Sequence, residues 1–202
     1  TADRLVGNVV RFVDLDSVQG SKDFNNNEAK VKLFDNNSST KFLTNQGVSA
    51  DNPVWVSFQL KEPKAIKAYS VVSADGAEGR DPVDWTFSGS NDGSTWTELD
   101  SQSGIEFGNR FESKTFTFEN DTAYAYYKIN ITKNKDGGSM VQFADLNIAT
   151  LDETDDELYE VAMATTIESG PASVHDAASN KGWTGDRALK VSGYHQGEGE
   201  AY

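Results

Sequence analysis

The 202-residue sequence has no cysteine, so it offers no disulfide, no metal-thiolate site and no thiol nucleophile. Histidine, the side chain whose ordinary pKa lies nearest neutrality, occurs only as His175 and His195, both close to the C-terminal end of the sequence. No apolar run approaches the roughly 18 residues of a membrane span. Basic residues are also scarce: 18 against 32 acidic residues give a net charge of −14. Without a basic patch, such a chain repels phosphate backbones and anionic lipid, so we expect neither a nucleic-acid nor a membrane partner.

The negative charge is unevenly distributed along the chain. Residues 1–150 carry 15 basic and 21 acidic groups, a net charge of −6, whereas residues 151–202 carry 3 and 11, a net charge of −8. We interpret residues 151–160 as a solvated connector between a domain at 1–150 and a fragment of a further β-sandwich domain at 161–202. Cation buffering is the alternative role for its acidic residues, which are Asp152, Glu153, Asp155, Asp156, Glu157 and Glu160.

Before this connector, apolar residues recur with the period of β-strands. In residues 54–60, Val54, Val56, Phe58 and Leu60 alternate with more polar neighbours, which indicates one buried and one wetter face. No convincing amphipathic helix interrupts the pattern. We therefore predict an all-β antiparallel β-sandwich with a short, partly ordered C-terminal extension. The predicted strands are 8–13, 41–44, 54–60, 67–74, 84–89, 95–100, 114–119, 124–132 and 141–148.

Short and long connections alternate between the predicted strands. The long ones are 14–31, 45–53, 75–83, 101–113 and 133–140. Because successive connections of an antiparallel meander lie at opposite ends, we expect the long loops from strand 54–60 onward to gather at one end. Loops held by a rigid scaffold are where binding residues concentrate, although these loops can also be merely tolerated insertions.

The long loops are rich in groups that suit neutral polyol ligands. Carboxylate, amide and guanidinium groups share hydrogen bonds with neighbouring hydroxyls, and an aromatic ring covers the C–H face of a sugar. Arg80 is the central candidate, with simple pairing to a nearby acid (Asp75, Glu78 or Asp81) as the alternative role. The predicted ligand-binding residues are Asp75, Glu78, Arg80, Phe107, Asn109, Arg110, Asn134 and Lys135, with Phe111 as a further loop aromatic.

Six segments, in order, carry a family resemblance. They are residues 33–42 (LFDNNSSTKF), 55–60 (WVSFQL), 80–85 (RDPVDW), 89–96 (GSNDGSTW), 126–129 (YYKI) and 141–146 (VQFADL). Over about residues 5–148 the sequence resembles the discoidin, or coagulation factor V/VIII type C, domain, whose jelly-roll fold is shared by family 32 carbohydrate-binding modules. The resemblance implies a non-catalytic module that binds glycan. It also implies that Trp85 and Trp96 are core aromatics.

Residues 35–40 crowd oxygen donors into one short segment, as Ca²⁺ requires. An Asx or Ser turn without metal is the alternative. Two positions depart from the family pattern: Asn36 stands where glycine is usual, and Asp145 where glutamate is usual. The family resemblance implies a structural Ca²⁺ site built from the carbonyls of Lys32 and Asn37, the carboxylate of Asp35, the hydroxyl and carbonyl of Thr40, and Ala144 and Asp145.

The end of the sequence resembles a second family. Residues 166–171 (TIESGP) and 182–193 (GWTGDRALKVSG) are similar to the opening of the N-terminal domain of family 92 glycoside hydrolases, which are α-mannosidases. This resemblance implies an appended catalytic domain in the same polypeptide. We expect the present chain to have no hydrolase activity of its own.

These observations favour a carbohydrate-binding module of a multidomain glycosidase, secreted or held at the surface of a bacterium, with any export signal removed. One alternative is a structural domain that packs on the catalytic domain without binding glycan. A lipid-binding discoidin domain is the other, but the loops are mostly polar or acidic, whereas lipid-binding loops need exposed apolar residues beside basic ones.

Overall fold

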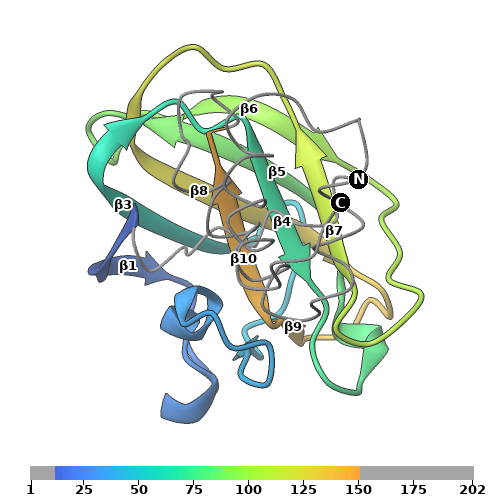
Figure 1. Cartoon of the computed structure of the whole chain (residues 1–202). Coiled ribbons are helices and arrows are strands. Elements are labelled where there is room, and N and C mark those ends of the chain that lie inside the picture. The colour runs from blue at the N-terminus through green and yellow to red at the C-terminus, as the bar shows by residue number, and fades with distance from the viewer. Residues whose placement is uncertain (1–11, 151–202) are drawn as a thin grey trace, which may run out of the picture. The chain divides into compact units, whose positions relative to one another are not determined.

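The computed structural model describes residues 12–150 (Figure 1). The predicted connector at 151–160 and the predicted domain fragment at 161–202 lie outside the described residues. Within 12–150, no helix is long and apolar enough to cross a membrane. The elements are β1 (Val13–Gly20), η1 (Asn26–Glu28), η2 (Lys30–Phe34), β2 (Phe42–Thr44), β3 (Val54–Lys64), β4 (Ala68–Val72), η3 (Glu78–Arg80), β5 (Pro82–Ser90), β6 (Thr97–Gln102), β7 (Ser113–Thr117), β8 (Tyr124–Asn134), β9 (Val141–Phe143) and β10 (Asp145–Ala149), where η marks a 3₁₀ helix.

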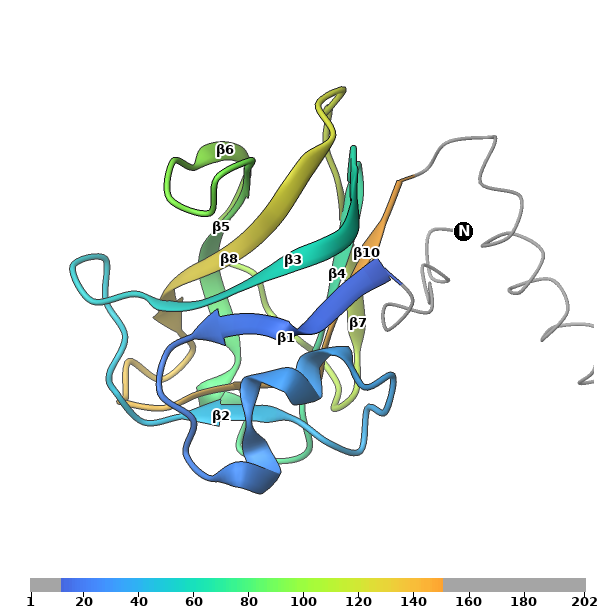
Figure 2. The ribbon, with the colours of Figure 1, turned by 90° about the vertical axis from the view of Figure 1, so that its left-hand side faces the viewer.

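The strands form two main layers, seen from the side in Figure 2. One sheet has the order β1-β3-β8-β5-β6, the other β10-β4-β7, and β2 pairs with β9. Every pairing is antiparallel. The predicted all-β antiparallel sandwich is confirmed.

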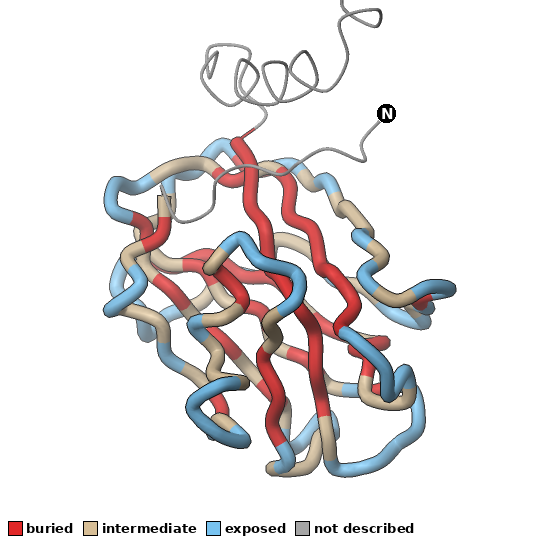
Figure 3. Tube along the Cα trace, turned by 60° about the horizontal axis from the view of Figure 1, so that its bottom comes forward, coloured by how far each residue is buried: buried red, intermediate tan, exposed pale blue. Residues whose placement is uncertain are grey.

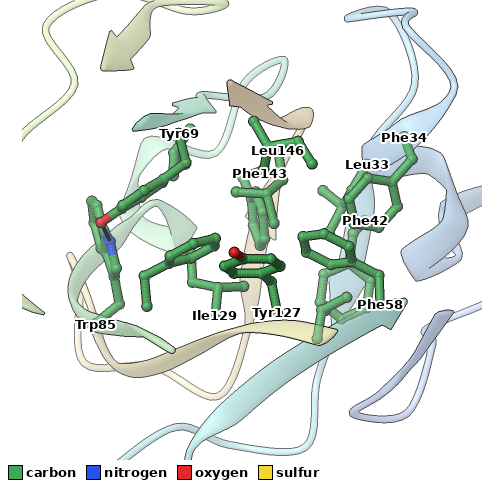
Figure 4. Close-up of a cluster of buried hydrophobic side chains, with 14 of the residues drawn as sticks. Leu33, Phe34, Phe42, Phe58, Tyr69, Trp85, Tyr127, Ile129, Phe143 and Leu146 are labelled. Carbon is green, nitrogen blue, oxygen red and sulfur yellow. Dashed lines mark hydrogen bonds between the residues drawn. The ribbon is translucent and has the colours of Figure 1, made fainter. Parts of the chain in front are cut away.

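Side chains on the facing surfaces of the two sheets fill the space between them. The alternating apolar residues of β3 are buried, as predicted, and so are those of β8. They are Val54, Val56, Phe58 and Leu60 on β3, and Tyr127, Ile129 and Ile131 on β8. Aromatic rings run through this core in contact: Tyr69 stacks on Phe87 with centroids 4.3 Å apart, and Phe87 on Tyr127 at 5.7 Å. Figure 4 shows Tyr69, Trp85, Tyr127 and Phe58 within this cluster.

Only one of the two tryptophans expected in the core lies there. Trp85 is buried, and its indole N–H donates to the Tyr69 hydroxyl at 2.8 Å. Trp96 is half-buried, and the Lys128 ammonium lies 4.2 Å from its ring centroid. The expectation for Trp96 is wrong because this residue lies between the preceding turn and the start of β6, and so is not itself part of a strand.

The structure differs from the predicted strands and loops in two segments. Residues 14–20, predicted as loop, belong to β1, a mostly polar strand with an irregular register against β3, so its alternation is weak. Residues 141–148, predicted as one strand, divide at Ala144 between β9 and β10. Ala144 is buried there, and its N–H donates to the carbonyl of Val72 at 2.8 Å.

The long loops gather at one end of the sandwich, as predicted. The strand ends that enter and leave them are neighbours in the registers: Val72 faces both Ser113 and Asp145, and Pro82 faces Asn134. This end, which we call the loop end, lies at the bottom of Figure 1, and Figure 3 shows exposed loops joining the buried strands there.

Candidate ligand-binding and metal sites

Backbone hydrogen bonds connect the long loops to one another. The N–H of Lys135 donates to the carbonyl of Asp81 at 3.1 Å, and that of Asp136 to Gly79 at 2.9 Å. The N–H of Phe111 likewise donates to the carbonyl of Ser73 at 3.1 Å. Segments 73–81, 103–112 and 135–140 therefore form one connected surface, although they are far apart in the sequence.

A partly buried ion pair lies at this surface, with its carboxylate buried and its arginine side chain 24% exposed. Asp81 is 1% exposed, and both of its carboxylate oxygens accept from the Arg110 guanidinium, Oδ1 from Nη1 at 2.8 Å. Nη1 also lies 3.3 Å from the carbonyl of Ala74 and 3.4 Å from that of Gly76. The hydrogen bond with Asp81 raises the pKa of Arg110. The structure thus shows the Arg110 guanidinium bracing the loop while the side chain remains 24% exposed, and the ligand role expected for Arg110 stays a prediction.

Arg80, next to this pair, is in a different situation. The three acids predicted as alternative partners each have another base: Asp75 pairs with Lys41 at 2.7 Å, Glu78 with Lys135 at 3.0 Å, and Asp81 with Arg110. Arg80 is half-exposed, and within the described part of the chain its guanidinium has no hydrogen-bond or ion-pair partner. The alternative role of pairing with Asp75, Glu78 or Asp81 is therefore not what the structure shows.

The 103–112 loop presents a different aromatic ring from the one expected. Phe107 is 2% exposed and belongs to the core, so its expected role as a surface plate is corrected. Phe111 is 49% exposed and has a left-handed backbone with φ 60°. Beside it, Asn109 has an exposed side chain, while its backbone N–H donates to Glu112 at 3.0 Å. Lys114 is the largest cause of the lowered pKa of Glu112.

Asn134 is a brace rather than a surface group. Its side chain is buried, and Nδ2 donates to the carbonyls of Gly138 at 3.1 Å and Met140 at 2.6 Å. These bonds hold the 135–140 loop closed, which corrects the ligand role expected for Asn134. A sequence signal was available, because the turn composition Asp136-Gly137-Gly138 begins two residues after Asn134.

The exposed part of the loop end thus presents both charges, an amide and one aromatic ring. The Glu78–Lys135 and Asp75–Lys41 pairs lie at the surface, where an ion pair contributes about 0–1 kcal/mol, so a ligand can open them at little cost. The predicted ligand residues that the structure brings together here are Asp75, Glu78, Arg80, Asn109 and Lys135.

The predicted metal segment forms a tight oxygen-lined turn. The Thr40 hydroxyl lies 2.8 Å from Oδ2 of Asp35 and 2.8 Å from the carbonyl of Asn37. Lys32 contributes a nearby carbonyl, 3.5 Å from the N–H of Asp35, and its ammonium lies 3.6 Å from Oδ2. Asn36 has a left-handed φ of 56°, the conformation for which the family pattern has glycine.

Asp145, at the start of β10, brings a second carboxylate to this turn. It is 6% exposed, and its Oδ1 is buried with no hydrogen-bond partner in the described structure. Burial, and then the negative charge of Asp35, raise the pKa of Asp145 to about 6. An orphaned carboxylate oxygen next to a second acid is an arrangement that a cation would stabilise.

The oxygen atoms around Asp35 and Asp145 are compatible with Ca²⁺. Carboxylates alone would not suffice as its ligands. Residues 12–150 contain no group of three or more His, Cys, Asp or Glu side chains suited to one ion. Further ligands would have to be neutral oxygens, which Ca²⁺ accepts readily. Those available are the carbonyls of Lys32, Asn37, Thr40 and Ala144 and the Thr40 hydroxyl.

Comparison with known proteins gives a consistent family. Residues 17–146 match the model of the F5/8 type C domain. A family 32 carbohydrate-binding module of Clostridium perfringens NanJ, in complex with galactose, superposes with a TM-score of 0.55 at 16% identity, covering 68% of this chain and 97% of that one. An F5/8 type C domain from Bacteroides fragilis gives a TM-score of 0.56 at 18% identity, covering 68% and 93%.

Two further similarities differ from each other in how much of each chain they cover. A Clostridium perfringens module in complex with GalNAc-β-1,3-galactose matches with a TM-score of 0.52 at 15% identity, covering 68% of this chain and 98% of that one. A peptide-N(4)-(N-acetyl-beta-glucosaminyl)asparagine amidase of Arabidopsis thaliana is 50% identical over 50 residues, which are 24% of this chain and 7% of that protein.

Proposed function

Because the chain belongs to the F5/8 type C domain family, we propose that it is a non-catalytic carbohydrate-binding module that binds a neutral glycan through its loop end. The observation that carries this proposal is Arg80, a half-exposed guanidinium left without a partner among residues 12–150, while Asp75, Glu78 and Asp81 are each paired with another base. A guanidinium donates in a fixed fork, which suits two neighbouring sugar hydroxyls.

The surroundings of Arg80 support a sugar as the ligand. Asn109 adds an amide that both donates and accepts, and the exposed ring of Phe111 offers an apolar plate. Related folds carry galactose and GalNAc-β-1,3-galactose in their solved complexes. A surface site with so few contacts binds weakly, with a Kd between about micromolar and millimolar, or roughly 4–8 kcal/mol.

Titration with monosaccharides, followed by NMR, tests this proposal. We expect galactose, N-acetylgalactosamine or mannose to shift signals of the 73–81 and 103–112 loops. Arg80→Ala should weaken binding about tenfold or more, because the fork is lost. Lys61→Ala, on β3 toward the opposite end, is the matched control and should leave binding unchanged. Binding that is absent for all three sugars, or indifferent to Arg80→Ala, contradicts the proposal.

A structural Ca²⁺ ion is part of the same proposal. Asp35 and Asp145 would hold it by their carboxylates, with carbonyls of Lys32, Asn37, Thr40 and Ala144 completing the shell. The bound ion would supply positive charge to the orphaned Oδ1 of Asp145 and tie the 32–40 turn to β10.

Chelation tests the ion separately from the sugar. Removing Ca²⁺ should lower Tm in the parent protein, and Asp145→Asn should abolish that dependence because one of two acidic ligands is gone. An unchanged Tm after chelation contradicts the site. Sugar binding measured with and without chelator shows whether the two sites are coupled.

We further propose that the module belongs to a secreted bacterial glycosidase, an α-mannosidase with an appended catalytic domain. Tethering would raise the effective concentration of the enzyme at its glycan. The pure chain should then show no turnover of an aryl mannoside, and deleting residues 1–150 from the whole enzyme should reduce activity on glycan-bearing surfaces but not on soluble substrate. Loss of activity on both substrates favours the alternative, a structural domain.

A further inference from the structure

The five-stranded sheet has a second face, turned away from the core and separate from the loop end. On its three central strands, β3, β8 and β5, this outer face carries the side chains that alternate with those of the core; on β5 two of them, Ser88 and Ser90, are also buried. Lys128 is the charged residue at its centre, and Lys61 and Asp84 follow the same alternation nearer its ends. The residues of this outer sheet face are Trp55, Ser57, Gln59, Thr86, Ser88, Ser90, Tyr126, Lys128, Asn130 and Thr132.

Lys128 lies at the centre of the outer sheet face without a counter-charge. Its cross-strand neighbours are Ser57 on β3 and Ser88 on β5, neither of which carries charge. No carboxylate of residues 12–150 lies within 4.0 Å of its ammonium. Burial lowers its pKa. In a chain with 32 acidic residues, a partly desolvated lysine with no acidic partner is unexpected.

Aromatic rings surround Lys128. Trp96 lies under the ammonium, with its centroid 4.2 Å away. Tyr126 is two residues before Lys128 on the same strand. Trp55, on the neighbouring strand β3, is diagonal to Lys128, because Ser57 faces Lys128 and Trp55 faces Asn130. Diagonal neighbours in a sheet are about 7–8 Å apart, within reach of long side chains.

The aromatic residues Tyr126 and Trp55 occur on the outer sheet face for different reasons. Tyr126 packs under the β5–β6 turn, where a Cβ on Gly93 would lie 3.5 Å from its Cε1 atom. Trp55 alternates with the buried residues of β3, so its indole points away from the core, and it remains partly exposed. The solvent side of an antiparallel sheet is normally polar, so a large indole beside an uncompensated ammonium requires another reason.

We propose that this outer sheet face is a second binding site, for a short anionic oligosaccharide such as a uronate chain. The carboxylate of one sugar pairs with Lys128, and the C–H face of a ring stacks on Trp55. The Asn130 and Gln59 amides, on β8 and β3, hydrogen-bond sugar hydroxyls. Charge complementarity selects the ligand: the charge at the centre of this face is positive, with Lys61 and Asp84 nearer its two ends, while the acidic chain as a whole repels dense polyanions such as nucleic acid.

Calorimetry with trigalacturonate and its methyl ester, in which the carboxylate charges are removed at the cost of one added methyl group each, tests this site. The intact chain should bind the free acid about tenfold more tightly than the ester, the effect of one charge-assisted hydrogen bond. Lys128→Gln should remove that preference, and Trp55→Ala should weaken both ligands. Lys67→Gln, which removes the same charge next to the other sheet, is the control and should keep the preference.

NMR separates this site from the loop end. Trigalacturonate should shift the indole N–H signals of Trp55 and Trp96, and Arg80→Ala should leave these shifts in place. The proposal is overturned if the acid and ester bind equally, if Lys67→Gln acts like Lys128→Gln, or if the shifts map to the loop end and vanish with Arg80→Ala. Circular dichroism of each variant establishes that a loss of binding is not a loss of fold.

Discussion

Among single residues, Tyr69 connects two polar groups of the core. Its buried hydroxyl accepts from the indole N–H of Trp85 at 2.8 Å and donates to Asp100 at 2.6 Å. Tyr69→Phe keeps the ring but leaves that N–H without a partner. We expect the free energy of unfolding to fall by about 1–3 kcal/mol, measured by urea denaturation. Tyr126→Phe, at a half-exposed site, should change it by less than about 0.5 kcal/mol; equal effects would refute this account.

Asp145 gives a residue-level prediction about pH. With chelator present, its folded pKa of about 6 exceeds the ordinary value of 3.8, so between these values the folded protein holds the proton more tightly than the unfolded chain. Stability from this group therefore falls as pH rises through that interval, by about 3 kcal/mol in total. Urea denaturation at pH 4 and pH 7 measures the slope. Asp145→Asn should flatten it, and an identical slope in the variant contradicts the assignment.

At the level of elements, the loop that presents Arg80 depends on the Asp81–Arg110 pair. Arg110→Ala leaves a carboxylate that is 1% exposed without its cation, and we expect a loss of about 3 kcal/mol in the free energy of unfolding. Arg110→Lys should recover only part of this, because lysine lacks the two-pronged fork. Lys135→Ala is the control: its partner Glu78 is 67% exposed, so the cost is about 0–1 kcal/mol. Chemical denaturation ranks the three variants, and equal losses would remove the special role of the pair.

Elements with strong alternation could be predicted from the sequence, and those held by distant contacts could not. The pattern of β3 shows its buried face directly, and the alternating loop lengths correctly place the long loops at one end. β1 escapes because its pairing with β3 is irregular and mostly polar. Phe107 and Asn134 look like surface groups in a loop, yet tertiary packing buries both. The pairing that leaves Arg80 unpartnered also depends on Lys41, Lys135 and Arg110, which no local motif connects to it.

For the whole molecule, the net negative charge is divided unequally between two segments of the sequence. Residues 1–150 have a net charge of −6 and residues 151–202 a net charge of −8, although the latter are a quarter of the chain. The mildly acidic segment holds both proposed binding surfaces. Neutral sugars are insensitive to the remaining charge, whereas an anionic ligand is repelled by it over about a Debye length, roughly 10 Å at 0.1 M salt.

A chain ending at Thr150 tests whether residues 1–150 are sufficient as a module. The buried core cluster of the described residues runs from Val13 to Ile148, so we expect the shortened chain to unfold cooperatively at the same urea midpoint as the full chain. Its affinity for a neutral monosaccharide should be unchanged, because the Arg80 surface is complete within these residues. Trigalacturonate should bind as well or better at low salt, because eight net negative charges are removed. A lower midpoint, or weaker binding of the neutral sugar, would show that residues 151–202 supply contacts on which the module depends.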